Sequence, residues 1–173
     1  MKNTPLKNLI VIAGIALFLN GCASTPPLTE ADRTFEKIVE APGFTKDQIY
    51  NAARIWIAQN FKSAKSVIEM DSKEDGIIVG NGIIPYPSSG LESVAKDGWK
   101  VPFSMRIDIK DQKFRVSFFN IMLSIPPSGT GTGRTSEFPV RRQSDMDAIK
   151  PVLLKFCDEI LASLNTNKAK SDW

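Results

Sequence analysis

The residues with the most recognisable chemical spacing are Ser93 and Lys96, in the segment Ser93-Val94-Ala95-Lys96. A serine followed three residues later by a lysine is the nucleophile pattern of penicillin-recognising serine enzymes. The Lys-Thr-Gly and Ser-Asp-Asn segments that accompany this pattern there are missing from the sequence. We therefore predict that the protein is not an enzyme, and retain a cell-wall-directed serine enzyme using Ser93 and Lys96 as the alternative.

Two further segments imitate ligand-binding loops. The run from Asp71 to Gly76 resembles half of a calcium loop, but Lys73 stands where an oxygen ligand is required, and Gly82 stands where the loop needs a glutamate. The glycine-rich run 129–134 lacks the Gly-Lys-Ser/Thr of a phosphate loop and does not lead from a strand into a helix. These patterns favour a hairpin turn and a flexible loop, so we predict no metal and no cofactor.

Histidine is absent from the 173 residues, which removes the commonest general base and zinc ligand. The formal net charge of +3 is too small to indicate a nucleic-acid partner. Cys157 stands in a helical apolar stripe with no histidine to activate it, so we interpret it as a small core residue. Composition thus excludes the classes of site that depend on these groups.

The N-terminal residues predict export and lipidation. Lys2 and Lys7 precede the short apolar run 9–19, which has the length of a signal-peptide core and is too short to span a bilayer. The run ends in Leu19-Asn20-Gly21-Cys22, which resembles a bacterial lipobox. We predict a signal peptide at 1–21, a fatty acid such as palmitate on Cys22, and a tether at 22–34. A plain secretory signal and a single membrane anchor are the alternatives.

This reading also predicts where the protein resides. Ser24 follows the pattern of outer-membrane sorting, so we expect a bacterial cell-envelope lipoprotein in the outer membrane, facing the periplasm. Without residues 1–21, which include two lysines and no acid, 20 basic and 19 acidic side chains are left, so the mature chain is almost neutral. Its partners are then the membrane, through the lipid, and an envelope protein or glycan.

The rest of the chain predicts one α+β domain at 35–165. Thr45 and Gln48 form a capping-box pattern that opens an apolar helical stripe over 46–60. Alternating or β-branched runs predict strands at 35–39, 66–71, 76–82, 101–109 and 114–118, and a second stripe predicts a helix from Ser144 or Asp147 to 164. We expect a long irregular loop at 124–143 and a frayed tail at 166–173.

This order is β-α-β-β-β-β-α, and adjacent hairpins followed by a helix favour an antiparallel sheet over a parallel one. Both helices need a partner for an apolar stripe. We therefore expect an antiparallel sheet of about five strands with the two helices on one of its faces.

The segment that begins FEKIVEAPGF and continues to VPFSMRIDIKDQKFRVSF resembles a bacterial family of secreted proteins of unknown function. The resemblance covers roughly 33–123 and includes Phe44, Thr45, Trp56 and Phe61. It implies a fold like that of the TATA-box-binding protein (TBP). It implies no activity, no catalytic residue and no DNA binding.

Several aromatic and basic residues are candidates for a binding surface. Tyr86 and Trp99 lie in a Pro/Gly/Ser-rich connection, where they either pack against the sheet edge or serve as binding anchors. Phe119 and Ile121 are expected to point away from the helices, where segment 124–143 either covers them or leaves them exposed. The candidates for a polar rim around this surface are Arg134, Arg141 and Arg142. We expect an envelope-facing binding or assembly module. The further alternatives are a structural or stress-response lipoprotein without a fixed partner and an inhibitor of an extracellular enzyme.

Overall fold

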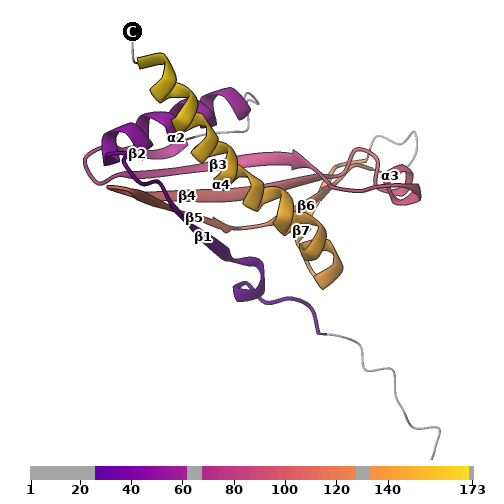
Figure 1. The fold of residues 1–173 in the computed structure, drawn as a ribbon. Helices are drawn as coiled ribbons and strands as arrows, with labels where there is room; N and C mark the ends of the chain where they lie inside the picture. The colour runs from indigo at the N-terminus through magenta and orange to yellow at the C-terminus, as the bar shows by residue number, and fades with distance from the viewer. Residues whose placement is uncertain (1–25, 62–67, 128–132, 172–173) are drawn as a thin grey trace, which may run out of the picture.

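The computed structural model describes residues 26–61, 68–127 and 133–171, with the side chains of 26–61, 68–127 and 133–166 (Figure 1). The predicted signal peptide, Cys22 and the first part of the predicted tether lie outside the described residues, as does most of the glycine-rich run. Helices and strands follow one another as η1 (Ala31–Arg33), β1 (Phe35–Glu40), α2 (Lys46–Asn60), β2 (Ile68–Ser72), β3 (Ile77–Pro85), α3 (Leu91–Ala95), β4 (Lys100–Lys110), β5 (Lys113–Phe119), β6 (Met122–Ile125), β7 (Ser136–Pro139) and α4 (Gln143–Ser171).

The strands form one antiparallel sheet in the order β1-β5-β4-β3-β2. The short strand β6 pairs with the beginning of β4 and with β7, so these two strands extend one end of the sheet. The period-two pattern of 101–109 gives β4 one buried face, since Val101, Phe103, Met105, Ile107 and Ile109 are all buried. The antiparallel sheet is confirmed.

Helix α2 begins where the capping box predicts. The Thr45 hydroxyl accepts a hydrogen bond from the Gln48 backbone amide, and the Gln48 side-chain oxygen accepts one from the Thr45 backbone amide. Tyr50 binds the Asp71 carboxylate on β2, and Arg54 pairs with the same carboxylate at 2.9 Å. These contacts fix the polar side of the helix against the sheet edge.

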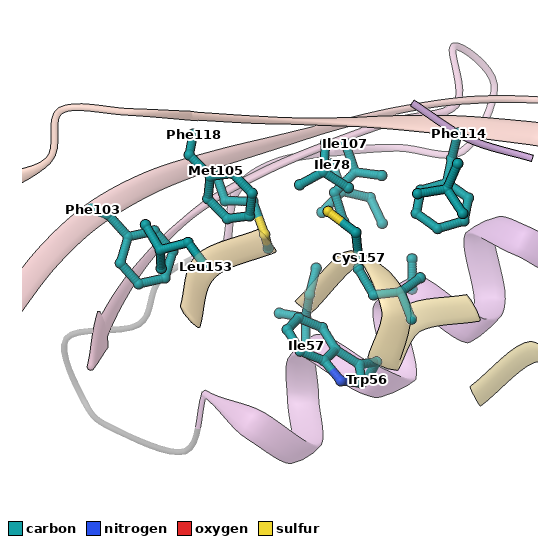
Figure 2. Packing of buried hydrophobic residues seen from close by; sticks show 14 of the residues in the cluster. Trp56, Ile57, Ile78, Phe103, Met105, Ile107, Phe114, Phe118, Leu153 and Cys157 are labelled. Atoms are coloured by element: carbon teal, nitrogen blue, oxygen red, sulfur yellow. The ribbon is translucent and has the colours of Figure 1, made fainter. Parts of the chain in front are cut away.

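Helices α2 and α4 lie on the same face of the sheet, as expected (Figure 1). Aromatic rings fill the space between the two helices and the sheet: Phe156 of α4 lies 5.1 Å from Trp56 of α2 and 6.1 Å from Phe103 of β4, measured between ring centroids. Figure 2 shows Cys157 pointing into this core beside Ile57 and Ile78. Cys157 is fully buried, and burial raises the pKa of its thiol to about 11.

The structure corrects several predicted boundaries. Segment 124–143 is not one irregular loop, because it holds the end of β6 and all of β7. Helix α4 continues through the predicted tail to Ser171 and contains Pro151. The described part of the tether is also bound to the domain: the Leu28 amide donates to the Arg141 carbonyl, and Arg33 donates to the carbonyls of Leu28 and Val140. Within the ranges described, no helix is long and apolar enough to cross a membrane.

Candidate ligand-binding cavity

A cavity of about 840 Å³ lies at the end of the molecule that carries α3, β6 and β7. Its volume falls within the range of known small-molecule sites, which is about 300–1,000 Å³. The walls come from the end of β3, the segment around α3, the start of β4, and the β6–β7 hairpin. The lining residues used below are Tyr86, Ser93, Lys96, Asp97, Trp99, Lys100, Ser124 and Glu137.

The wall formed by the α3 segment is the loop that connects β3 to β4, and a backbone hydrogen bond closes its base. The Tyr86 amide donates to the Trp99 carbonyl at 2.9 Å, so the chain leaves and rejoins the ladder at neighbouring points. The two rings pack edge to face with centroids 5.8 Å apart. Gly98 takes a positive φ of 73° before the return, a conformation that favours glycine. The fold therefore places both loop aromatics in one wall.

A cluster of four side chains holds this wall against α4. The Lys96 ammonium donates to Tyr86 Oη at 2.7 Å and contacts Glu92 Oε1 at 2.6 Å and Asp145 Oδ1 at 3.0 Å. The Tyr86 hydroxyl donates to Asp145 Oδ1 at 2.7 Å. Lys96 thus has a partner for each of its three protons. We call Lys96, Tyr86, Asp145 and Glu92 the Lys96 cluster.

The electrostatics of the Lys96 cluster keep the lysine charged. Burial disfavours the ammonium, but its hydrogen bonds with Glu92, Tyr86 and Asp145 outweigh burial and raise the pKa of Lys96 well above its usual range. Burial, together with the hydrogen bond to Asp145, raises the pKa of Tyr86, although Lys96 opposes this. At neutral pH the cluster therefore contains an ammonium and a neutral phenol.

This arrangement differs from a serine–lysine catalytic pair. Ser93 Oγ donates to the Gly90 carbonyl at 2.6 Å rather than to Lys96. Lys96 holds its protons too tightly to accept one from Ser93, because its pKa is raised. The Ser93/Lys96 alternative thus lacks an activated nucleophile in this geometry.

The side chains around the cavity suit a polar ligand of balanced charge. Two cations, Lys96 and Lys100, are matched by two anions, Asp97 and Glu137. The hydroxyls of Ser93 and Ser124 add neutral donors and acceptors, and the half-buried Trp99 adds an apolar surface. In the part of the chain that the structure describes, no group of three or more acidic or cysteine side chains could hold a metal ion.

The predicted contact residues are only partly brought together here. Trp99 lines the cavity, and Tyr86 does too, although Tyr86 is only 6% exposed, which agrees with the packed alternative for this residue rather than with an exposed anchor. Arg134 lies next to the lining residue Thr135, and the exposed Arg141 precedes the first turn of α4, which carries Asp145. Exposed Arg142 follows Arg141 at the same end of the molecule.

Two of the predicted contacts lie elsewhere. Ile121 is fully buried, so a surface contact at this residue is wrong. Strand β5 ends at Phe119, and Asn120 has a positive φ of 50°, so the alternation of faces that predicted an outward Ile121 does not continue past this point. Phe119 is half-buried on the face of the sheet opposite the helices, where it is paired in register with Ser104.

The sequence analysis missed Asp145 and Glu137. Asp145 is 6% exposed near the start of α4, where it was indistinguishable from an ordinary helix-opening acid. Glu137 belongs to β7, which was not predicted, and accepts from the Ser124 hydroxyl at 3.2 Å. The β-prone Phe138 beside Glu137 is a local signal for β7, but a run of four residues is too short to predict a strand from its pattern.

The comparisons with known proteins agree on the fold. The sequence profile of a family described as a domain of unknown function (DUF4468) with TBP-like fold matches residues 35–123. A crystal structure of a TBP-like protein from Parabacteroides distasonis is similar with a TM-score of 0.62 and 12% identity, covering 81% of this chain and 97% of that one. A crystal structure of a DUF4468 family protein from Bacteroides ovatus is similar with a TM-score of 0.51 and 18% identity, covering 82% of this chain and 88% of that one. The comparison with curated proteins gave no match.

Proposed function

Since the chain belongs to the DUF4468 family with TBP-like fold, whose description assigns no activity, we propose a function from the cavity itself: a lipid-anchored envelope module that binds a polar ligand of low net charge. The observation that carries this proposal is the cavity of about 840 Å³ with Trp99 in its wall. Cavities of this size with a few polar groups are the usual form of a small-molecule site.

A glycan is the ligand class that we favour. The flat indole of Trp99 offers an apolar surface to the C–H face of a sugar ring, while Ser124 and Glu137 offer hydrogen bonds to its hydroxyls. The two cations and two anions of the lining favour a ligand with little net charge over a polyanion such as a nucleic acid. The bacterial envelope is rich in saccharides, which fits the location proposed from Cys22.

The binding test uses tryptophan fluorescence. In a Trp173→Phe background the chain retains Trp56, which is buried in the core, and Trp99 in the cavity wall. Titration with peptidoglycan fragments and envelope oligosaccharides is expected to shift the emission of Trp99. A Trp99→Phe variant should lose this response while keeping the signal of Trp56.

Two carboxylate variants, one in the cavity and one far from it, distinguish binding in the cavity from binding elsewhere on the surface. Glu137→Gln should weaken binding about tenfold or more, which corresponds to the loss of roughly 1.4 kcal/mol from one charged hydrogen bond. Glu40→Gln, at an exposed carboxylate at the end of β1, should bind like the parent protein. Equal affinities of the two variants, or no fluorescence response to any saccharide, would contradict a glycan site in this cavity.

The proposed anchor needs its own test. Cys22→Ala should abolish incorporation of labelled palmitate and leave an unprocessed or soluble form, because the lipobox cysteine carries the fatty acid. Cell fractionation and labelling measure both effects. Membrane partition with retained label in the variant would rule out lipidation at this residue. In-cell crosslinking followed by affinity purification then reports whether an envelope protein, rather than a glycan, is the main partner.

A further inference from the structure

The most exposed large apolar side chains of the described residues are on α3. Leu91 is 92% exposed and Val94 is 78% exposed, whereas the next most exposed, Ile38, reaches 60%. Leu91 and Val94 stand three positions apart on a helix, so they present a single apolar ridge to solvent. A ridge this exposed contributes nothing to the core, and it suggests a surface contact.

The tether leaves the domain at the same end of the molecule. Leu28 is held at the start of α4 by its hydrogen bond to the Arg141 carbonyl. Cys22 precedes Leu28 by six positions, and six residues span at most about 20 Å when fully extended. A lipid on Cys22 would therefore keep the first turn of α4 within about 20 Å of the membrane surface.

The α3 ridge is fixed to this end by the Lys96 cluster. Lys96, directly after α3, contacts Asp145 in the first turn of α4 at 3.0 Å. Figure 1 shows α3 at the end of the sheet toward which the N-terminal turns of α4 point, whereas α2 covers the other end. The tether, the first turn of α4 and the exposed ridge thus share one end of the domain.

Three cationic side chains belong to segments at the same end of the domain as the ridge. Lys100, Arg141 and Arg142 are exposed, and among the described residues no ion pair involves them. Of the acids at this end, Glu92 is already paired with Lys96. Asp97 and Glu137 line the cavity together with Lys100. Arg141 and Arg142 are therefore the cations near this end that no lining acid offsets. An apolar ridge with neighbouring free cations is the combination that binds an anionic lipid surface.

We propose that this end of the domain docks on the lipid bilayer, with Leu91 and Val94 in the interface and Lys100, Arg141 and Arg142 at the level of the headgroups. The inference rests on the lipid anchor of the proposed function, since the anchor supplies the proximity. The cavity borders α3, so docking holds its rim close to the membrane surface.

The test places a fluorescent probe on the lipidated full chain in vesicles of phosphatidylethanolamine and phosphatidylglycerol that carry acyl-chain bromines. Single cysteines at Ser93→Cys, between the two ridge residues, and at Ile55→Cys, on α2, bear the probe. Cys157 is fully buried and its thiol pKa is raised, so it does not compete for the label. Ser93→Cys should be quenched several-fold more strongly than Ile55→Cys.

A second set of variants tests the ridge itself. Leu91→Asp with Val94→Asp should remove the quenching at Ser93→Cys, while Ile38→Asp, at an exposed apolar residue of the sheet, should leave it unchanged. Vesicle flotation is measured on every sample. Flotation with equal quenching at the two probes overturns the docking inference and leaves the anchor intact, whereas loss of flotation overturns both.

Discussion

Replacing Lys96 with methionine keeps most of the aliphatic stem and removes the charge at the centre of the Lys96 cluster. Its partner Asp145 would then stay in a site where its side chain is only 8% exposed. The hydrogen bond from the Tyr86 hydroxyl is the contact of the cluster that survives at Asp145. The variant should therefore be destabilised by an acid that is buried without its cation.

The size of this effect follows from burial and distance. Unit charges 3.0 Å apart attract by roughly 5 kcal/mol at an effective dielectric constant of about 20. Truncating the lysine also removes the cost of burying it, so the net loss is smaller than the attraction. Breaking a buried pair typically costs about 3–5 kcal/mol, and the surviving Tyr86 contact puts our expectation at about 3 kcal/mol.

The chain provides a matched control in the pair of Lys73 and Asp47. Its N–O distance is also 3.0 Å, but the side chains are 53% and 64% exposed. Exposed pairs contribute about 1 kcal/mol or less, so Lys73→Met should be nearly neutral. The comparison varies burial while the distance of the ion pair stays the same.

Urea unfolding followed by circular dichroism measures both variants. With a slope of about 2 kcal/mol per molar urea, the loss expected for Lys96→Met lowers the midpoint by about 1.5 M. Asp145→Asn should reduce the cost of Lys96→Met when the two are combined, since no buried charge is then left alone. Equal midpoints for Lys96→Met and Lys73→Met would refute the reasoning from burial.

Three further predictions concern the core and the turns. The Cys157 thiol has an ordinary pKa of 9.0 in the unfolded chain and a pKa of about 11 in the folded domain, so stability should fall as the pH rises from 9 to 11. Urea unfolding measured over this pH range should show a smaller fall for Cys157→Ala. Gly76→Ala should lower the stability by about 2 kcal/mol or more, because φ is +70° and the new Cβ would lie 2.6 Å from the Ile109 carbonyl oxygen. Gly43→Ala, where φ is +81° but the space is open, should lower it by only about 1 kcal/mol. Equal urea midpoints of the two variants would contradict this. Phe118→Ala removes a fully buried ring and should cost about 3–5 kcal/mol by thermal unfolding, so a loss below about 1 kcal/mol would show that the core refills the space.

The elements that sequence analysis predicted correctly are those with local signals. Thr45 and Gln48 mark the start of α2 because a capping box involves residues only three apart. The alternation from Val101 to Ile109 predicts β4 because one face of that strand is buried throughout this range. Such patterns depend only on residues that are close together in the sequence.

The candidate site could not be predicted in the same way because its partners are distant in the chain. Lys96 and Asp145 are separated by 49 positions, and only the packing of α4 across the sheet brings them together. Ser93 and Lys96 were noticed for their spacing, yet spacing did not reveal that the lysine faces two carboxylates. Ile121 follows a break between two strands at Asn120, whose positive φ a strand pattern does not encode.

The position of α4 has a consequence for how the domain is produced. Residues matched by the family profile end at 123, but Phe156, Cys157 and Ile160 of α4 complete the core over α2 and the sheet. Until α4 has been synthesised, one face of the sheet exposes the apolar side chains that this helix covers. The export that we propose would benefit from that delay, because a domain whose last helix completes its core stays incompletely packed until that helix arrives. Folding of such an exported chain would then be coupled to the arrival of the C-terminal helix on the far side.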